Sequence, residues 1–197
     1  MESNDTRERL IGAMADALQR RGLHGMGLTE LLAQAQAPKG VLYHHFPGGK
    51  AELAVAAINA SAQRMVDSLD KALKQDASDP LAALHAWLQR SQRQLSDSGF
   101  ERGCPLATVA LESAPDDTAI RAALAQAFAA IRASVACAFV AAGQSAAQAA
   151  GTAALIVAAY EGGLMQSRVT GTAQPMAQVL DTLIALLQPR PTPKARR

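Results

Sequence analysis

Apolar residues recur every three or four positions along most of this chain, and no stretch alternates convincingly at the spacing of a β-strand. Leu10, Met14 and Leu18 show the pattern early in the chain. Alanine, which has the highest helix propensity, is abundant, and hydrophobic residues make up 49% of the 197 positions. We therefore expect an all-α fold with enough apolar side chains to fill a sizeable core.

Helix-breaking residues divide the N-terminal part of the chain into three short helices. Asp5 is placed to cap the first helix, which should end at Gly22. A glycine-bearing turn then leads to a second helix at residues 28–36. Pro38 suits the first turn of a third helix, and Pro47 ends that helix. Two short helices with a tight connection have the proportions of a helix-turn-helix.

The sequence divides into three parts. Residues 1–50 form the helix-turn-helix domain, and residues 51–188 carry the longer helical pattern of a second domain. Residues 189–197 hold four Lys or Arg and no acidic residue among several prolines, so we expect a disordered basic tail.

The segment at residues 38–50 concentrates cationic, aromatic and histidine side chains. It lies in a stretch between Glu30 and Glu52 that contains no acidic residue, although the chain has 17. The net charge of +2 is too small to indicate a nucleic-acid partner, but its local distribution does. Neutralisation of phosphates supplies most of the affinity of such contacts, so the segment predicts DNA binding.

Within the third helix, Leu42 and Phe46 share one face and should hold it against the first two helices. The other face then points outward, where Lys39 can reach guanine or a phosphate. Lys50, at the start of the next helix, can hold a phosphate together with the free N–H groups there. The candidate DNA-contacting residues are Thr29, Pro38, Lys39, Gly40, Val41, Tyr43, His44, His45 and Lys50.

Residues 40–46 read G-V-L-Y-H-H-F and are followed by Lys50 and Leu53. This string resembles the third helix of TetR-family transcriptional regulators. Its spacing, and the later G-C-P-L-A-T segment at residues 103–108, resemble the LmrA/YxaF branch of that family. Pro38 stands where the family usually has Ser or Thr, and Gln36 where a turn glycine is common.

The resemblance implies a homodimeric repressor of a near-palindromic double-stranded DNA operator, released by a small-molecule effector. The effector would lie in the all-helical C-terminal domain. Small residues at positions 151–163 and the apolar stripe Leu180, Leu183, Ile184 and Leu187 would form the dimer interface, with packing inside one subunit as the alternative. Candidate effector-binding residues are Trp87, Glu112, Phe128, Tyr160, Glu161, Met165 and Arg168.

No catalytic motif, phosphate loop or metal-ligand spacing appears, so we expect no enzyme activity, cofactor or metal. Cys104 and Cys137 fit reduced thiols, with redox sensing left open. The N-terminus lacks a signal-peptide pattern and no apolar run is long enough for a membrane span, which predicts a cytoplasmic protein. Two alternatives stay open. One is a helical small-molecule-binding protein or enzyme with a vestigial helix-turn-helix, and the other is an architectural DNA binder without an effector.

Overall fold

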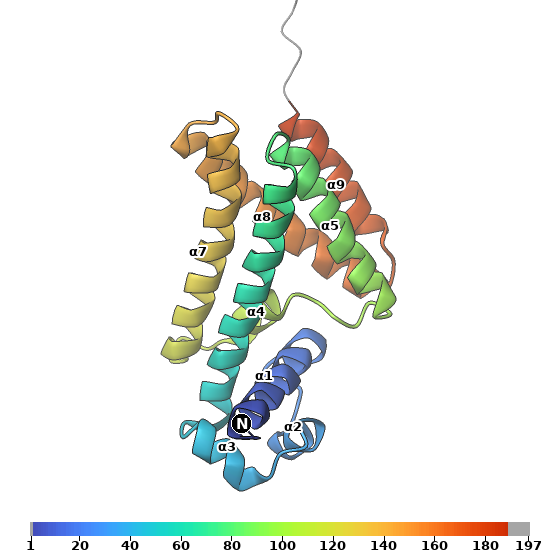
Figure 1. The fold of residues 1–197 in the computed structure, drawn as a ribbon. Coiled ribbons are helices and arrows are strands. Elements are labelled where there is room, and N and C mark those ends of the chain that lie inside the picture. The colour runs from blue at the N-terminus through green and yellow to red at the C-terminus, as the bar shows by residue number, and fades with distance from the viewer. Residues whose placement is uncertain (1, 189–197) are drawn as a thin grey trace, which may run out of the picture.

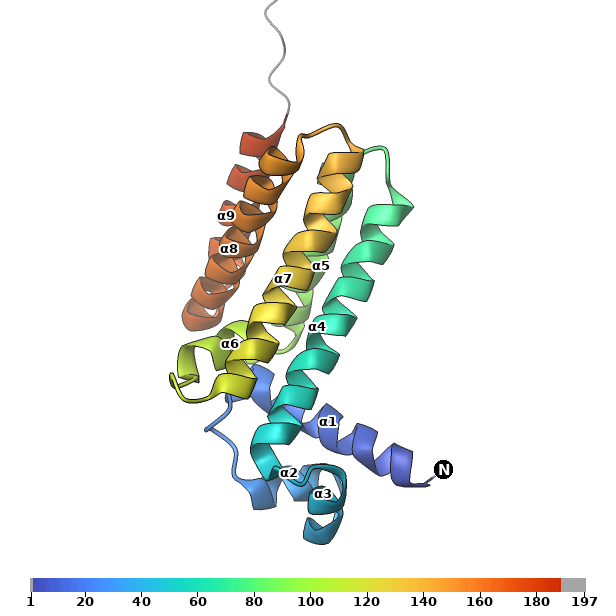
Figure 2. The same cartoon turned by 90° about the vertical axis from the view of Figure 1, so that its left-hand side faces the viewer.

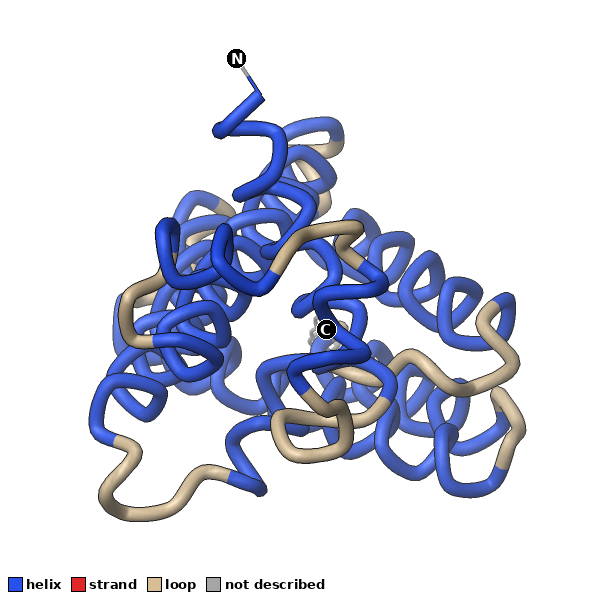
Figure 3. Tube along the Cα trace, turned by 90° about the horizontal axis from the view of Figure 1, so that it is seen from below, coloured by secondary structure: helices blue, strands red, loops and turns tan. Residues whose placement is uncertain are grey.

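The computed structural model describes residues 2–188, and in that range it consists of helices joined by turns, without strands (Figures 1 and 3). The all-α prediction is confirmed. The predicted basic tail, residues 189–197, lies outside the described residues. The helices are α1 Glu2–Arg20, α2 Leu28–Gln34, α3 Lys39–His45, α4 Gly49–Gln75, α5 Pro80–Asp97, α6 Pro105–Glu112, α7 Thr118–Ala141, α8 Ala146–Thr170 and α9 Gln174–Leu187.

Helices α1 to α3 form a small unit at one end of the molecule (Figure 1). Leu10 and Leu18 of α1 are fully buried in it, as their spacing predicts. The predicted N-cap at Asp5 is wrong, because α1 begins at Glu2. Asp5 instead lies inside the helix and forms an ion pair with Arg9, one turn further on.

The long helix α4 connects this unit to the rest of the chain. It begins beside α3, packs against α1, and continues between α5 and α7 (Figures 1 and 2). Leu53 and Ile58 in its first half and Leu69 in its second half are all fully buried. Both ends of α4 therefore belong to one continuous apolar core.

Helices α5 and α7 pack against α4, and α8 and α9 complete the body by packing against each other and against α7 and α5. Ser145 is the N-cap of α8, and its side chain and that of Gln148 form a reciprocal capping box. By length and composition α7 is apolar enough to cross a membrane, the one such helix in the described range. Its buried residues, among them Ile131 and Val135, pack against α4 and α8, as in the core helix of a globular domain.

Helices α8 and α9 pack closely against each other through Gly163. A Cβ atom at this position would lie 2.8 Å from the Met176 sulfur and 3.4 Å from the Met176 Cα, so an added side chain would force the buried methionine to move. Leu180 and Leu183 of α9 are buried within the same chain. For these two residues the alternative of packing inside one subunit is the correct one. An interface with another chain would have to use the opposite face of the helix pair.

Candidate nucleic-acid interface and candidate ligand cavity

Helix α3 is held to its neighbours by one apolar face. Leu42 is fully buried and Phe46, which ends the helix, is 2% exposed. Leu31 of α2 and Ala35 directly after it are buried in the same core. With that face fixed, Tyr43 on the other side is left 47% exposed.

The N-terminal turn of α3 is open to solvent. Pro38 precedes the helix as its N-cap and, lacking a hydroxyl, makes no side-chain cap. Lys39 and Gly40 are exposed, and a Cβ atom added at Gly40 would contact nothing within 4 Å. The protein's own packing therefore does not require glycine at position 40. An external surface that approaches the backbone closely would require it.

The structure brings the predicted DNA-contacting residues together at one end of the molecule, on α2, α3 and the start of α4. Val41, His45 and Lys50 among them are half-buried. The exposed ones are Thr29, Pro38, Lys39, Gly40, Tyr43 and His44.

Lys50 has a contact that the sequence did not predict. Its ammonium donates a hydrogen bond of 2.7 Å to the backbone carbonyl of Met26, in the turn before α2. This bond fixes the start of α4 against the helix-turn-helix. It uses one of three ammonium donors, so the charge remains available at this surface.

Two turns shape the unit through left-handed backbone conformations. Gln36, between α2 and α3, has φ of +50°, and Gly49, the first residue of α4, has φ of +67°. The glycine expected by resemblance would suit position 36, and glutamine there is strained. At Gly49 a Cβ atom would lie 3.4 Å from the Tyr43 ring, so this turn also positions the tyrosine.

Arg7 of α1 adds a cation that the sequence analysis missed. Its guanidinium lies 5.4 Å from the centre of the Phe46 ring, which places an exposed positive charge beside α3. No local sequence signal connects two residues so far apart in the chain.

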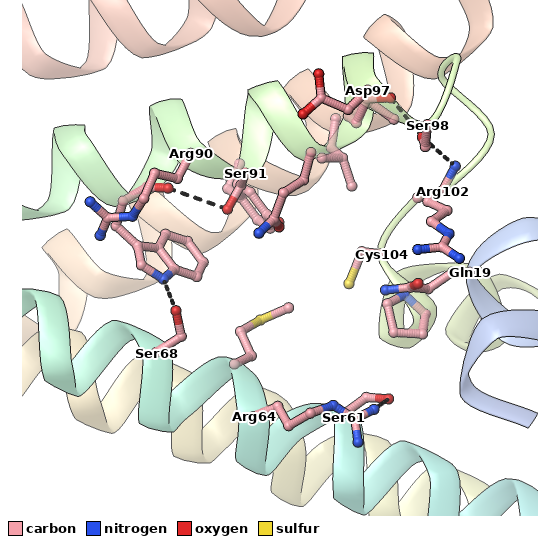
Figure 4. A pocket seen from close by; sticks show the side chains of 18 of the residues that line it. Gln19, Ser61, Arg64, Ser68, Arg90, Ser91, Asp97, Ser98, Arg102 and Cys104 are labelled. Atoms are coloured by element: carbon pink, nitrogen blue, oxygen red, sulfur yellow. Dashed lines mark hydrogen bonds between the residues drawn. The ribbon is translucent and has the colours of Figure 1, made fainter. Parts of the chain in front are cut away.

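A cavity of about 930 Å³ lies in the body between α4, α5 and α8, and extends to the end of α1. Figure 4 shows side chains of α4 and α5 facing each other across it, with Gln19 and Cys104 at the α1 end. Trp87 and Tyr160 form an aromatic wall, with ring centres 5.6 Å apart. The Trp87 indole N–H donates to the Ser68 hydroxyl at 3.1 Å, which fixes the orientation of the ring.

The predicted effector-binding residues divide into three groups. Trp87 and Tyr160 line the cavity. Glu161 lies behind it, beside Cys104, and lines a small apolar space of about 20 Å³. The remaining four line neither of these spaces, and they are Glu112, Phe128, Met165 and Arg168.

Glu161 is an acid in an apolar setting. Its Oε2 atom is buried and has no hydrogen-bond partner among the described residues. Burial raises the pKa of this carboxyl from 4.5 to about 7, and a hydrogen bond with the Cys104 thiol opposes the shift only in part. Burial also raises the pKa of Cys104 well above its usual value, with the Glu161 charge adding to the effect. This thiol is therefore protonated at neutral pH and weakly nucleophilic.

Glu112 and Arg168 take part in a different arrangement, which we call the seam: the contacts between the body and the end of α1. The Glu112 carboxylate accepts a hydrogen bond from the Leu23 backbone N–H, and Arg168 donates to the Arg20 carbonyl. The Gly103 N–H donates to the Gln19 carbonyl at 3.0 Å.

Ion pairs strengthen the seam. Asp16 of α1 pairs with Arg102 at 2.6 Å, and Arg20 pairs with Glu101. Gln19, Arg20, Arg102 and Gly103 also line the cavity. One wall of the cavity is thus bonded directly to the helix that supports the helix-turn-helix.

Comparisons with known proteins agree with this arrangement. Residues 10–57 match the family described as bacterial regulatory proteins, tetR family, and residues 80–182 match the LmrA/YxaF-like transcriptional regulator C-terminal domain. The HTH-type transcriptional regulator LmrA of Bacillus subtilis is 27% identical over 95% of this chain and 100% of its own.

Two solved structures share the fold. The regulatory protein TetR from Rhodobacter sphaeroides has a TM-score of 0.81 and 26% identity, covering 90% of this chain and 96% of its own. The reduced form of NemR from E. coli has a TM-score of 0.75 and 26% identity, covering 91% and 96%.

Proposed function

Because this chain is a transcriptional regulator that belongs to the TetR family, with an LmrA/YxaF-like C-terminal domain, we propose that it is a homodimeric repressor released from its operator by a small molecule. The observation that carries the proposal is the shared wall: residues at the end of α1 line the cavity and are bonded to the body through the seam. The two proposed domains meet there, the helix-turn-helix at residues 1–50 and the body at residues 51–188. The cytoplasm, where operator DNA lies, is its proposed location.

The exposed face of α3 supports the DNA half of the proposal. Lys39, Gly40 and Tyr43 project from a helix whose opposite face is buried, the geometry of a recognition helix in a major groove. Two such helices about one turn of DNA apart, roughly 34 Å, would read a near-palindromic operator.

The outer face of the α8–α9 pair supports a homodimer. On α8 an exposed or half-buried stripe of small and apolar residues repeats with alternating spacings of four and three, and Leu186 of the neighbouring helix α9 is also exposed. Met165 is 54% exposed and Val169 83% exposed, which is unfavourable unless another surface covers them. The α8 stripe consists of Gly151, Leu155, Ala158, Gly162, Met165 and Val169.

The shared wall supports release by an effector. A molecule in the cavity would contact Gln19 and Arg20 at one end and Trp87 at the other. If it favours a position of α1 that misaligns the recognition helices, it lowers the population of the DNA-binding conformation. A differential affinity of a few kcal/mol is enough to shift such an equilibrium.

Selection of bound duplexes from a random library, followed by mobility shift on the selected sequence, tests the proposal. Wild-type protein should select a near-palindromic site, and Tyr43→Ala and Lys39→Ala should each weaken its binding at least tenfold. Lys74→Ala, an exposed lysine at the far end of α4, is the matched control and should bind as wild type. A protein with a vestigial helix-turn-helix would select no sequence, which would overturn the proposal.

A ligand screen separates the repressor from an architectural DNA binder. Fluorescence of Trp87, the one tryptophan of the chain, reports on the cavity wall without a label. A repressor should yield compounds that both quench this fluorescence and release the selected DNA. Compounds that quench without releasing DNA would contradict effector control.

A further inference from the structure

The cavity contains two arginines that no carboxylate neutralises. Four arginines line it, and two of them, Arg20 and Arg102, belong to the ion pairs of the seam. Arg64 of α4 and Arg90 of α5 form no ion pair with any described side chain. Within residues 2–188, Arg64 donates a hydrogen bond of 3.2 Å to the Ser61 hydroxyl and to no carboxylate.

The groups around these two arginines are neutral. Ser68 and Ser91 supply hydroxyls, and Trp87 and Tyr160 supply aromatic surface. Asp97, the acidic residue that lines the cavity, lies near Ser98 at the end of α5, two turns beyond Arg90 (Figure 4). Both arginine side chains are exposed to solvent, and among the described residues no carboxylate forms an ion pair with either of them.

Resting on the proposed function, we infer that the effector is an organic anion: a carboxylate, sulfonate or phosphate ester joined to an aromatic or other apolar body. Arg64 on α4 and Arg90 on α5, which line opposite sides of the cavity, supply the positive charge that attracts its charged group, and the apolar body lies against Trp87 and Tyr160. Guanidinium groups bind such oxyanions through paired N–H donors, and the Ser68 hydroxyl, which accepts from Trp87, can add a further donor. The volume suits a drug-sized molecule, since ligand cavities commonly measure about 300–1,000 Å³.

A pair of dyes with the same ring system tests the charge requirement. The anion 1-anilinonaphthalene-8-sulfonate and the neutral N-phenyl-1-naphthylamine differ by the sulfonate, and both accept energy from Trp87. Wild-type protein should bind the anion at least tenfold more tightly than the neutral dye, measured by quenching of Trp87 emission. Equal affinity for the two dyes, or no quenching by the anion, would overturn the inference.

Variants of the two arginines locate the charged group. Arg64→Gln and Arg90→Gln should each weaken binding of the anionic dye about tenfold, the loss expected for one charge-assisted hydrogen bond. Binding of the neutral dye should change less than about twofold. Arg93→Gln is the matched control, because Arg93 lies on the same helix as Arg90 but outside the cavity lining, and it should bind both dyes as wild type. Unchanged affinity for the anion in both cavity variants would overturn the assignment.

The mobility shift distinguishes failure of this inference from failure of the proposed function. Without any dye, Arg64→Gln and Arg90→Gln should bind the selected operator as wild type, because neither residue lies near α3. A chain that binds no DNA but discriminates the dyes would refute the repressor and leave the anion site standing. A chain that binds DNA but binds both dyes with equal affinity would refute the anion site and leave the repressor proposal standing.

Discussion

The guanidinium of Arg168, on α8, donates a hydrogen bond to the backbone carbonyl of Arg20 at the end of α1. These residues are separated by most of the chain, and their contact joins the proposed dimerisation helix to the DNA-binding unit. The arginine also fills the space beside Gly103, where a Cβ atom would lie 3.2 Å from its Nη1 atom. One side chain thus holds together three segments of the seam.

Arg168→Gln should loosen the end of α1, because the shorter side chain cannot reach the Arg20 carbonyl. We expect a decrease of about 1–3 kcal/mol in the free energy of unfolding, the usual cost of losing a charged hydrogen bond. Hydrogen exchange should become faster at residues 17–25 and stay unchanged at residues 5–12. If the exchange rates at residues 17–25 are the same in the variant as in the wild type, this contact does not restrain α1.

Gly40→Ala should separate stability from DNA binding. A methyl group at position 40 meets no protein atom, and alanine favours helix, so the free energy of unfolding should rise by up to about 1 kcal/mol. The same methyl group would project toward the DNA, and operator affinity should fall at least tenfold. Urea denaturation and mobility shift measure the two effects. A variant that is more stable but binds the operator as tightly as the wild type would show that Gly40 does not lie in the DNA interface.

Gln36→Gly should stabilise the helix-turn-helix. Glutamine at φ of +50° is strained by roughly 1–2 kcal/mol, and the greater unfolded-state freedom of glycine offsets part of the gain. We expect a net increase of about 0.5–1 kcal/mol in urea denaturation. Ala33→Gly, an exposed helical position in α2, is the control and should lose about 1 kcal/mol. A loss of stability in Gln36→Gly would contradict the assigned strain.

Glu161→Gln should change how stability depends on pH. The pKa of the wild-type carboxyl is about 7 in the folded chain and 4.5 as the reference value, so between these the folded state binds more protons than the unfolded state. Wild-type stability therefore decreases as the pH rises from 4.5 to about 7, and this loss is absent from the glutamine variant.

The stability difference between variant and wild type should accordingly grow by up to about 3 kcal/mol between pH 5 and pH 8, since one pKa unit corresponds to about 1.4 kcal/mol. Denaturation at a series of pH values measures it. Asp181→Asn, an exposed position on α9, serves as the control and should keep the wild-type pH profile. A constant difference at all pH values would place Glu161 in contact with water.

Val169→Glu should disrupt the proposed dimer. The residue is 83% exposed in one chain, so a charge there does not disturb the fold, but it would be buried without a partner in the interface. Sedimentation should show a monomer. Leu111→Glu, 81% exposed on α6 and outside the α8–α9 face, is the matched control and should keep the wild-type mass. If both variants keep the wild-type mass, Val169 does not lie in the dimer interface.

Patterns that are local in the sequence predicted most of the fold. The spacing of Leu10, Met14 and Leu18 depends only on helix geometry, and all three are buried. Ser145 caps α8 because the capping box needs only residues within one turn. Asp5 was misassigned because the same side chain serves equally well as a cap and as a partner for Arg9.

Contacts between distant residues could not be predicted in this way. Glu112 and Arg168 are polar residues in a mostly apolar body, which suggested ligand contacts, yet each satisfies a backbone group at the end of α1. Arg64 and Arg90 have the sequence pattern of ordinary solvated charges. Only the packing of α4 against α5 shows that both line one cavity.

The continuity of α4 has a mechanical consequence. At 27 residues the helix is about 40 Å long, and it runs without interruption from the Tyr43 end of the molecule to the far end of the body. The cavity residues of α4 lie about 22 Å from its N-terminal end, so a tilt of about 5° at the cavity displaces that end by about 2 Å. In a symmetric pair the two ends would move in opposite directions, so the separation of the two recognition helices would change by about 4 Å against a groove repeat of roughly 34 Å.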